Sequence, residues 1–327
     1  MNPVKHLLKL AKVYLNYIFR RNHCSYAPQR LWIELSSRCN LECRLCVNKD
    51  IPSNLKGDMD LNLYKKIIDE VQGHVYDINL FHRGEPLLHP DIIEIIEYAN
   101  KKGIKTRIHT NSTLLSQDLS KKIILAGLDL ISLSFDGYTK KTYEKNRVNA
   151  NYTKSLKNII NFLKLKKELN SKKPFTILQV MEFDEELRSQ DFEEQKKQFL
   201  DNFYGLPLDK LVIRKPHNWG GGLQGHDGAL SEKLLQCTFP WYAMVILFDG
   251  SVCLCPQDFF GIMRIGNALQ TSLKDLWLSN EAAILRNKCV EKRFDKTDPC
   301  TACDRICRRN IFGIPVEYLS KFLKEMV

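Results

Sequence analysis

The sequence predicts an α/β fold with a helix-covered, mainly parallel sheet, followed by a small cysteine-rich C-terminal domain. From residue 31 onward, six short β-rich runs alternate with amphipathic helical stretches, which is typical of a parallel sheet with its helices outside. Glycine and proline gather in "PHNWGGGLQGHDG" at 216–228, which indicates a domain boundary, and seven of the eleven cysteines lie beyond it. The pattern allows either an open doubly wound sheet or a partial barrel.

The strand candidates are rich in β-branched and aromatic residues, and they lie at 31–36, 76–81, 104–110, 128–135, 175–181 and 210–215. Helices are predicted between them at 61–72, 90–102, 116–126, 152–169 and 188–202. The helix at 90–102 has Pro90 at its start, acidic residues in its early turns, lysines in its last turn and Gly103 just after it. In both sheet arrangements, we expect the functional site at the carboxyl ends of the strands.

Beyond the boundary, "AMVILFDGSVCLC" predicts a hairpin whose turn contains Asp249 and Gly250. Short helices are expected at 272–278 and 280–288, and a last helix after Pro315. The chain is therefore expected to consist of an N-terminal segment at 1–29, a core domain at 30–220 and a C-terminal domain at 230–327.

The N-terminal segment "VKHLLKLAKVYLNYIFRR" predicts a basic amphipathic helix, because its polar positions recur at helical spacing. It carries charge through its middle and has no small-residue cleavage site, which argues against a signal peptide. Such a helix can lie on a membrane surface or pack across the main domain, and the sequence leaves both readings open. Since no apolar stretch reaches the ~18 residues of a membrane span, we expect a cytoplasmic protein, with peripheral contact at the inner membrane surface as an option.

Basic residues exceed acidic ones by 49 to 38, a formal net charge of +11. They are spread along the chain in short runs, and no motif of a nucleic-acid-binding module accompanies them. A solvated basic surface is therefore expected, without a nucleic-acid partner.

The eleven cysteines fall into separate groups: Cys24 alone, three at 39–46 and seven between 237 and 307. In an intracellular chain of this size, that count favours metal or redox chemistry over disulfides. Three thiolates are an incomplete set for structural zinc, although a distant histidine could complete it, and a disulfide would leave one of the three over. A cubane 4Fe–4S cluster held by three cysteines would keep one iron open for a ligand.

The loop "CNLECRLC" resembles the Cys-x3-Cys-x2-Cys signature of radical S-adenosylmethionine (radical SAM) enzymes, and "INLFHRGEPLLHPDI" resembles that family's Gly-Glu-Pro motif. "HTNSTLLS" and "ISLSFDG" match at the ends of the third and fourth strands. The resemblance covers about 30–215 and implies a partial (β/α)6 barrel. It implies that Cys39, Cys43 and Cys46 hold a 4Fe–4S cluster, and that SAM is bound by Gly84, Glu85, Pro86, Thr110, Asn111, Ser134, Asp136 and Arg147.

Structural readings of the same residues remain open at this stage. Glu85 could pair with Arg83, and Ser134 and Asp136 could be turn formers at a strand end. Arg147 is matched to a family arginine that reaches the carboxylate of the cofactor. His82, His89 and His109 are as readily structural as functional.

The resemblance also implies the chemistry. One electron from the low-potential cluster cleaves the SAM sulfonium, which gives methionine and a 5′-deoxyadenosyl radical. The protein orients the cofactor and keeps water away from the radical. An electron donor such as flavodoxin or ferredoxin is expected as a partner.

The C-terminal cysteines resemble the auxiliary-cluster region of the SPASM/twitch branch of this family. Cys237 and Cys255 flank Gly250 at the matching spacing, and "CTAC" supplies Cys300 and Cys303. The later cysteines of the full SPASM pattern are absent, so we expect the shorter twitch version with one auxiliary 4Fe–4S cluster on these four cysteines. Cys253, Cys289 and Cys307 are left over as substitutes, and four cysteines on a zinc ion is the alternative reading.

The spacing and size of the chain resemble a twitch-domain radical SAM dehydrogenase that oxidises an alcohol on an aminocyclitol. The resemblance implies that the substrate is a sugar, polyol or aminocyclitol, and that the auxiliary cluster accepts the electron released by its oxidation. Asp258 is the candidate base. Arg214, His217 and Trp219 are candidate substrate contacts, with packing as the plainer role for Trp219.

Three other functions stay open. Many relatives modify peptides, but about thirty residues before the barrel leave no room for the usual recognition domain. A redox-neutral epimerase would use a thiol such as Cys253 to return hydrogen to the substrate. A non-catalytic zinc protein that binds nucleic acid belongs to a different class, and metal analysis separates it from the enzymes.

Overall fold

The computed structural model describes residues 3–216, 218–219, 222–223, 236–294, 299–303, 310–311 and 314–315. These residues form two compact units. The barrel unit comprises residues 32–216 and 247–250, and the auxiliary unit comprises the described residues of 1–31, 217–246 and 251–327. The N-terminal segment, which was expected as a separate element, thus belongs with the C-terminal residues.

The parallel strands of the barrel unit follow one another in chain order. They are β1 (Arg30–Ile33), which begins at the unit boundary, β2 (Asp77–Asn79), β3 (Lys105–Thr110), β4 (Leu130–Asp136), β5 (Phe175–Met181) and β6 (Lys210–Arg214). Every pairing from β2 to β6 is parallel. All six predicted strands are therefore present, and together they form the predicted partial barrel.

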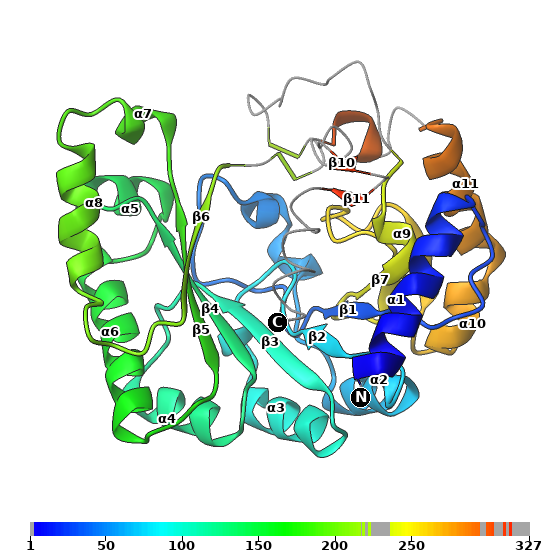
Figure 1. Cartoon of the computed structure of the whole chain (residues 1–327), viewed down its shortest axis with the longest axis horizontal. Coiled ribbons are helices and arrows are strands. Elements are labelled where there is room, and N and C mark those ends of the chain that lie inside the picture. The colour runs from blue at the N-terminus through cyan, green and yellow to red at the C-terminus, as the bar shows by residue number, and fades with distance from the viewer. Residues whose placement is uncertain are drawn as a thin grey trace. The chain divides into compact units, whose positions relative to one another are not determined.

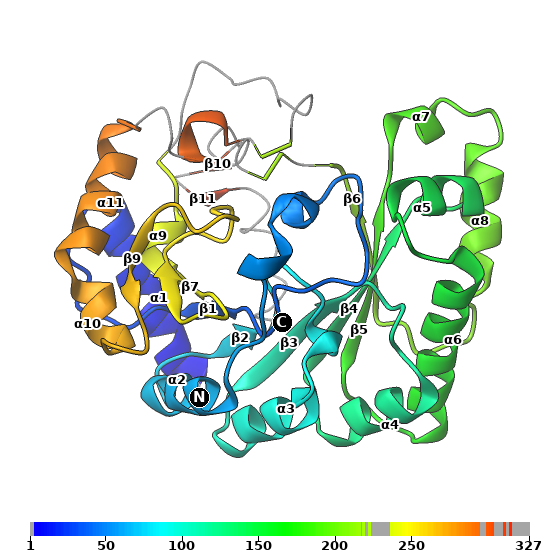
Figure 2. The ribbon, with the colours of Figure 1, turned by 180° about the vertical axis from the view of Figure 1, so that it is seen from behind.

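Helices connect these strands: α2 (Leu61–Val71), α3 (Ile92–Lys101), α4 (Gln117–Leu125), α5 (Lys140–Asn146), α6 (Tyr152–Glu168), α7 (Asp184–Leu187) and α8 (Phe192–Asp201). Side chains of Asp60, Ser116 and Asn151 cap α2, α4 and α6 by accepting backbone N–H groups. The helix expected at 188–202 begins only at Phe192, and the short helices α5 and α7 were not predicted. Figures 1 and 2 both show α3, α4 and α6 along the outer face of the sheet.

The two faces of the sheet differ in chemistry. Ile108, Leu133 and Leu178 are fully buried and lie on the face that the helices cover, because side chains alternate along a strand. The residues on the other face include the half-buried polar His109, Ser134 and Gln179, together with apolar residues such as Ile177. The inner face of the barrel unit therefore presents polar groups, whereas the apolar core lies between sheet and helices.

The auxiliary unit contains α1 (Pro3–Ile18), α9 (Phe239–Tyr242), β7 (Ala243–Ile246), β8 (Ser251–Cys253), β9 (Arg264–Asn267), α10 (Leu273–Leu278), α11 (Asn280–Glu291), η4 (Pro299–Ala302), β10 (Asn310–Ile311) and β11 (Ile314–Pro315). Strands β7 and β8 form the predicted antiparallel hairpin, and β9 adds a third strand that was not predicted. The two predicted short helices are present as α10 and α11. The helix expected after Pro315 lies outside the described residues.

A buried arginine joins the N-terminal segment to the rest of this unit. The Arg286 side chain is fully buried and donates to the carbonyl oxygens of Asn22 (2.9 Å), Pro240 (3.0 Å) and Trp277 (3.1 Å). Its guanidinium also lies over the Trp277 ring, 4.4 Å from the centroid. Each carbonyl oxygen is thus satisfied inside the unit. Among the described residues, no helix combines the length and the apolar character that crossing a bilayer requires.

Candidate metal and cofactor site

The three N-terminal cysteines lie in an irregular loop directly after β1, at the carboxyl end of the strand. Cys39, Cys43 and Cys46 are each half-buried, and none of the ten described cysteines forms a disulfide. The backbone N–H of Cys46 donates to the carbonyl of Cys43 at 3.1 Å, and Cys46 then begins the short helix η1 (Val47–Asp50). The loop therefore presents three free thiols at the end of the barrel where a site was expected.

Burial makes these thiols hard to ionise singly. It raises the pKa of Cys43 to about 12 and that of Cys46 to about 11, and the neighbouring thiols act in the same direction on both. The pKa of Cys39 is raised as well, chiefly by burial and also by Glu85. Three thiolates close together need a strongly positive centre to balance them, and an iron–sulfur cluster supplies one. The donor set thus fits such a cluster, with a single loop supplying three of its four corners.

Gly84 lies where the cysteine loop and the loop after β2 meet. A Cβ atom at Gly84 would lie 2.3 Å from the carbonyl oxygen of Arg38 and 2.4 Å from that of Ser36. The next backbone N–H, that of Glu85, donates to the same Arg38 oxygen at 2.8 Å. Only glycine allows this close approach, so the residue is required here by space.

Asn48 joins the same two loops through its side chain. It is almost completely buried, and its Nδ2 donates to the carbonyl oxygens of Ser37 (2.9 Å) and Arg83 (2.7 Å). Sequence reasoning missed this residue, because an asparagine two positions after a cysteine carries no distinctive signal. Its two hydrogen bonds fix the distance between the cysteine loop and the Gly-Glu-Pro segment.

Glu85 connects the ends of β2 and β3. One carboxylate oxygen accepts the N–H of Leu87 at 3.1 Å, and the other accepts the N–H of Asn111 at 2.8 Å. Burial raises the pKa of Glu85 to about 7, although these hydrogen bonds act to lower it. Arg83, the alternative partner weighed for Glu85, instead forms a buried ion pair with Glu34.

Glu34 was not singled out in the sequence, although it is fully buried at the end of β1. Besides Arg83, it accepts the backbone N–H of Phe248 at 3.0 Å. The only sign of Glu34 in the sequence was a charged residue in an otherwise apolar strand. Its ion-pair partner, Arg83, lies 49 positions away. Such a buried pair is retained only with good geometry and further hydrogen bonds, and both are present.

Thr110 ends β3, and Asn111, directly after it, contacts the cysteine loop. Asn111 donates to the side-chain oxygen of Asn40 at 2.9 Å and lies 3.9 Å from the Cys39 sulfur. The Thr110 hydroxyl accepts the N–H of Ser112, which forms a local turn. Asn111 thus lies beside the cysteine loop, and its contact with the cofactor stays a prediction.

Arg147 and Asp136 form a buried ion pair of 3.0 Å beside the cysteines. Burial acts to lower the pKa of Arg147, but Asp136 and then Cys43 outweigh it, so the pKa is raised. Arg147 in turn favours the thiolate forms of Cys39, Cys43 and Cys46. Its Nε is buried and has no hydrogen-bond partner among the described residues. An unsatisfied buried donor beside a cluster loop fits an anionic cofactor group such as a carboxylate.

Two more predicted residues can be placed next to this pair. Ser134 is half-buried on the same face of β4 as Asp136, because the two are two positions apart. Pro86 begins the short helix η3 (Pro86–Leu88), which Glu85 caps with its side chain. The structure therefore gathers all the positions matched to the SAM site around the ends of β1 to β4.

The three histidines near this site differ in their surroundings. His89 lies 2.9 Å from the Met59 carbonyl oxygen through one ring nitrogen and accepts the N–H of Asp91 through the other, which is a structural role. His109 stacks on Phe81 with ring centroids 4.1 Å apart. Burial lowers the pKa of His82 to about 3, with Arg83 acting in the same direction.

The four auxiliary cysteines also come together, although they lie far apart in the sequence. Burial raises the pKa of Cys255 well above its ordinary value, and Cys237, Cys300 and Cys303 each raise it further. The thiols are therefore close enough to repel one another when charged. Among the described residues, no group of three or more His, Cys, Asp or Glu side chains is arranged to hold a single metal ion. A four-iron cluster is larger than one ion, and it suits four such cysteines.

The spare cysteines and the candidate base have visible roles in packing. Cys253 and Cys289 are buried, whereas Cys307 lies outside the described residues. Both carboxylate oxygens of Asp258 are occupied, since they accept the N–H groups of Ile262 and Met263 at 2.8 Å each. Burial raises its pKa. Asp258 thus braces its own loop, and its role as a base stays a prediction.

The three candidate substrate contacts belong to different parts of the chain, and their role in binding stays a prediction. Arg214 is exposed at the end of β6, and His217 lies outside the described residues. Trp219 packs edge-on against Phe259 with centroids 5.2 Å apart, which is the packing role considered for it.

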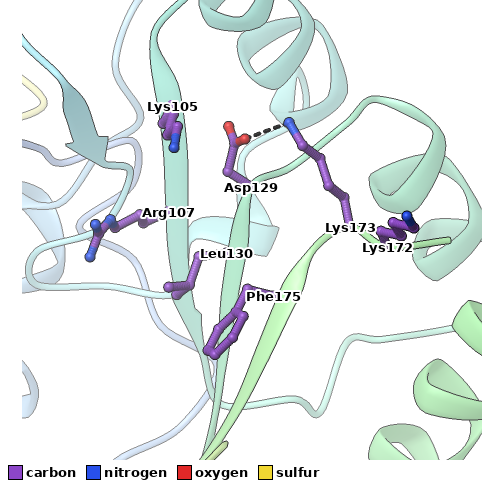
Figure 3. A pocket seen from close by; sticks show the side chains of 7 residues that line it. All are labelled: Lys105, Arg107, Asp129, Leu130, Lys172, Lys173 and Phe175. Carbon is purple, nitrogen blue, oxygen red and sulfur yellow. Dashed lines mark hydrogen bonds and ion pairs between the residues drawn. The ribbon is translucent and has the colours of Figure 1, made fainter. Parts of the chain in front are cut away.

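A pocket lies at the opposite, amino end of the strands (Figure 3). It is lined by Lys105, Arg107, Asp129, Leu130, Lys172, Lys173 and Phe175. Asp129 pairs with Lys173 at 2.5 Å across it. Since β3, β4 and β5 begin here, this pocket is separate from the cysteine loop at their far ends.

Comparisons with known proteins agree with this geometry. The family model of the radical SAM superfamily matches residues 33–188, and that of the SPASM iron–sulfur cluster-binding domain matches residues 237–304. The tungsten-containing aldehyde ferredoxin oxidoreductase cofactor-modifying protein of Pyrococcus furiosus is 26% identical over 291 residues, which are 86% of this chain and 74% of that protein. The AdoMet-dependent heme synthase of Methanosarcina barkeri is 34% identical over 121 residues, which are 37% of this chain and 35% of that protein.

Two solved structures share the fold. BtrN in complex with AdoMet and 2-DOIA has a TM-score of 0.57 at 18% identity, over 85% of this chain and 93% of that chain. SuiB of Streptococcus suis bound to the precursor peptide SuiA has a TM-score of 0.63 at 16% identity, over 98% of this chain and 79% of that chain.

Proposed function

Because the chain belongs to the radical SAM superfamily and carries the SPASM iron–sulfur domain of that superfamily, we propose that it dehydrogenates a carbinol carbon of a sugar, polyol or aminocyclitol. A cluster held by Cys39, Cys43 and Cys46 would supply the electron for SAM cleavage, and a cluster held by the auxiliary cysteines would accept the electron that the substrate loses. The observation that carries the proposal is the gathering of Cys237, Cys255, Cys300 and Cys303, a complete cysteine set that leaves no position for a second SAM.

The barrel unit supplies the binding groups for SAM. Cys39, Cys43 and Cys46 hold three corners of the first cluster, and Gly84 with Glu85 orients the methionine ammonium. Glu85 already accepts two backbone hydrogen bonds, so its carboxylate is held rigidly before the cofactor arrives. The unpartnered Nε of Arg147 provides a donor for the methionine carboxylate.

In the rest of the reaction the substrate loses one hydrogen atom, one proton and one electron. The carbinol C–H bond would give its hydrogen atom to the 5′-deoxyadenosyl radical and the hydroxyl its proton to a base. A cluster on the four auxiliary cysteines would take the remaining electron. The substrate carbon becomes a carbonyl. Since Asp258 is occupied by its own loop, a base on the polar inner face of the barrel unit is an alternative to it. A flavodoxin or ferredoxin returns the electron used for cleavage.

A second candidate, peptide modification, has one specific observation in its favour. The fold matches that of SuiB, crystallised with a precursor peptide, over nearly the whole of this chain. We favour the small-molecule substrate because BtrN, crystallised with 2-DOIA, is matched over nearly all of its own length.

The test uses the purified, anaerobically reconstituted protein with candidate sugars and aminocyclitols deuterated at the carbinol carbon. We expect deuterium in 5′-deoxyadenosine and a ketone product for one of them, with no 5′-deoxyadenosine from the Cys39→Ala variant. Deuterium transfer from a precursor peptide, and from no polyol, would decide for the second candidate.

A further inference from the structure

One face of helix α1 packs against the rest of the auxiliary unit, to which the helix itself belongs. Val13, Asn16 and Tyr17 are buried on it. The Tyr17 hydroxyl donates to the carbonyl oxygen of Gln236 at 2.9 Å, and its ring meets Trp241 edge-on at 5.6 Å. These contacts hold the helix on the rest of the unit, and the Lys12 ammonium also donates to the Ser25 carbonyl oxygen at 3.2 Å.

The opposite face of α1 is apolar too, and it is exposed. Leu8 and Phe19 are each 65% exposed, Leu15 is 51% exposed and Ile18 is 41% exposed. Leu15 lies seven residues after Leu8, and Ile18 and Phe19 lie three and four residues after Leu15. At these spacings the four side chains form one stripe along the helix and the residue that follows it. A surface helix normally turns polar residues outward, whereas this one exposes four large apolar side chains beside the exposed Lys12.

The helix α6 of the barrel unit shows the ordinary arrangement in the same protein. Its exposed positions include Lys154, Lys157, Asn161 and Lys164, all of them polar. Single exposed apolar residues such as Leu125 and Leu269 occur elsewhere, but α6 has no stripe like that of α1 among these positions.

The charges around the stripe have a single sign. Lys9, Lys12, Arg20 and Arg21 lie within or just after α1, and the chain has no acidic residue before Glu34. An apolar stripe on a helix whose own charged side chains are all cations is complementary to the surface of an anionic bilayer.

The stripe is presented by a fixed element. Arg21 accepts the indole N–H of Trp241 at 2.9 Å through its carbonyl oxygen, and the Tyr26 hydroxyl donates to the Trp241 carbonyl at 2.8 Å. Together with the bond from Arg286 to Asn22, these contacts fasten both sides of the turn that follows α1. The helix therefore offers its outer face without first having to fold, which removes an ordering cost from docking.

We propose that α1 docks on the surface of an anionic phospholipid bilayer. Leu8, Leu15, Ile18 and Phe19 enter the interface between headgroups and acyl chains, and the flanking lysines and arginines lie at the phosphates. The helix lies in the plane of the surface, which agrees with its length of 16 residues. The enzyme is thereby concentrated at a membrane, independently of which substrate it takes.

The test is co-sedimentation of the reconstituted full chain with vesicles of equal parts phosphatidylglycerol and phosphatidylcholine, and with phosphatidylcholine alone. We expect binding to the anionic vesicles, weaker binding as salt rises, and little binding to the neutral ones. The Leu8→Ser/Leu15→Ser variant should bind at least about tenfold more weakly, because two buried leucines are lost. The Lys12→Gln/Arg20→Gln variant should lose about fivefold per charge.

Leu125 and Leu269 provide a matched control, since they are 67% and 60% exposed elsewhere on the surface. A Leu125→Ser/Leu269→Ser variant should bind vesicles as the unaltered protein does. The proposal is overturned if the protein stays in the supernatant with anionic vesicles, or if both double serine variants bind equally. It is also overturned if Leu8→Ser/Leu15→Ser only converts a dimer to a monomer, since a second copy then covers the stripe. SAM cleavage by this variant should be unchanged, so these outcomes are separate from those that test the reaction.

Discussion

The two cysteine groups reach their positions in different ways. The three of the barrel unit stand within eight residues on one loop, whereas the four of the auxiliary unit come from residue 237, residue 255 and the segment at 300–303. The first group depends on a local backbone conformation, which Gly84 and Asn48 hold in place. The second depends on the folding of the whole auxiliary unit. A single substitution can therefore disable the first site locally, whereas the second site is as stable as its unit.

The largest effect should come from removing one ligand of each group. Both Cys39→Ala and Cys300→Ala should lower the iron content from about eight to about four atoms per chain. Only Cys39→Ala should abolish 5′-deoxyadenosine formation, because the SAM-binding corner is lost. Cys300→Ala should still cleave SAM but give no oxidised product, since its electron acceptor is gone. Iron and sulfide analysis and mass spectrometry of both products measure this.

That comparison breaks if the two variants behave alike. Retained 5′-deoxyadenosine in Cys39→Ala would remove the assignment of the first site. Loss of SAM cleavage in Cys300→Ala would mean that the auxiliary set is needed for the first step as well, and the proposed division of roles would be wrong.

The second effect concerns the loop and not its ligands. Gly84→Ala places a Cβ against the carbonyl oxygens of Arg38 and Ser36, so the cysteine loop must shift. We expect about four of the eight irons to be lost and SAM cleavage to fall more than tenfold, with the auxiliary cluster intact. Gly73→Ala is the control for backbone strain alone, because a Cβ there meets no atom within 4 Å although its φ of +75° disfavours alanine. We expect it to lower stability and to keep the full iron content. A Gly84→Ala protein with a full iron content would show that the loop tolerates the shift.

The third effect is on stability. Asn48→Ala removes the two donors that satisfy the Ser37 and Arg83 carbonyls in a buried place. Each unsatisfied group costs about 1–3 kcal/mol, so the loss of two should lower the free energy of unfolding by about 2–6 kcal/mol. The exposed Asn161 on α6 is the matched control and should change it by less than about 0.5 kcal/mol. Urea unfolding of the two alanine variants compares them, and equal midpoints would contradict the bracing role.

Much of the architecture could be predicted because the signals were local. The six strands follow from β-branched runs, most helices from apolar periodicity, and both cysteine groups from spacing. The short helices α5 and α7 escaped prediction because seven and four residues are too few to show a helical period. Strand β9 has only four residues and includes Gly266, which weakens its strand signal.

The supporting contacts of the site could not be predicted from the sequence. Arg83 stood next to Gly84 and Glu85, and a local pairing with Glu85 was the natural alternative. In the structure Arg83 forms its ion pair with Glu34 instead. Glu34 lies 49 positions away in the sequence and comes close to Arg83 only in the folded sheet. Asp258 is similar, because its spacing from Cys255 shows nothing of the two N–H groups that occupy it. Sequence motifs identify candidate ligands. The tertiary structure determines which polar side chains are already engaged in hydrogen bonds and which can still bind a cofactor or substrate.

The smallest effect we predict concerns pH and the barrel unit alone. Burial lowers the pKa of His82 to about 3 in the folded protein, whereas an unfolded histidine has a pKa of about 6.5. Between these values the unfolded chain binds a proton that the folded chain does not. The free energy of unfolding is therefore at its full value above about pH 6.5 and decreases as the pH falls below it. At about pH 5 the loss should be about 2 kcal/mol, at about 1.4 kcal/mol for each pH unit. The His82→Asn variant cannot take up this proton, and its urea midpoint should change less between about pH 7.5 and pH 5. If the two proteins lose the same stability on acidification, His82 is accessible to protons in the folded state, and the acid sensitivity arises from other groups.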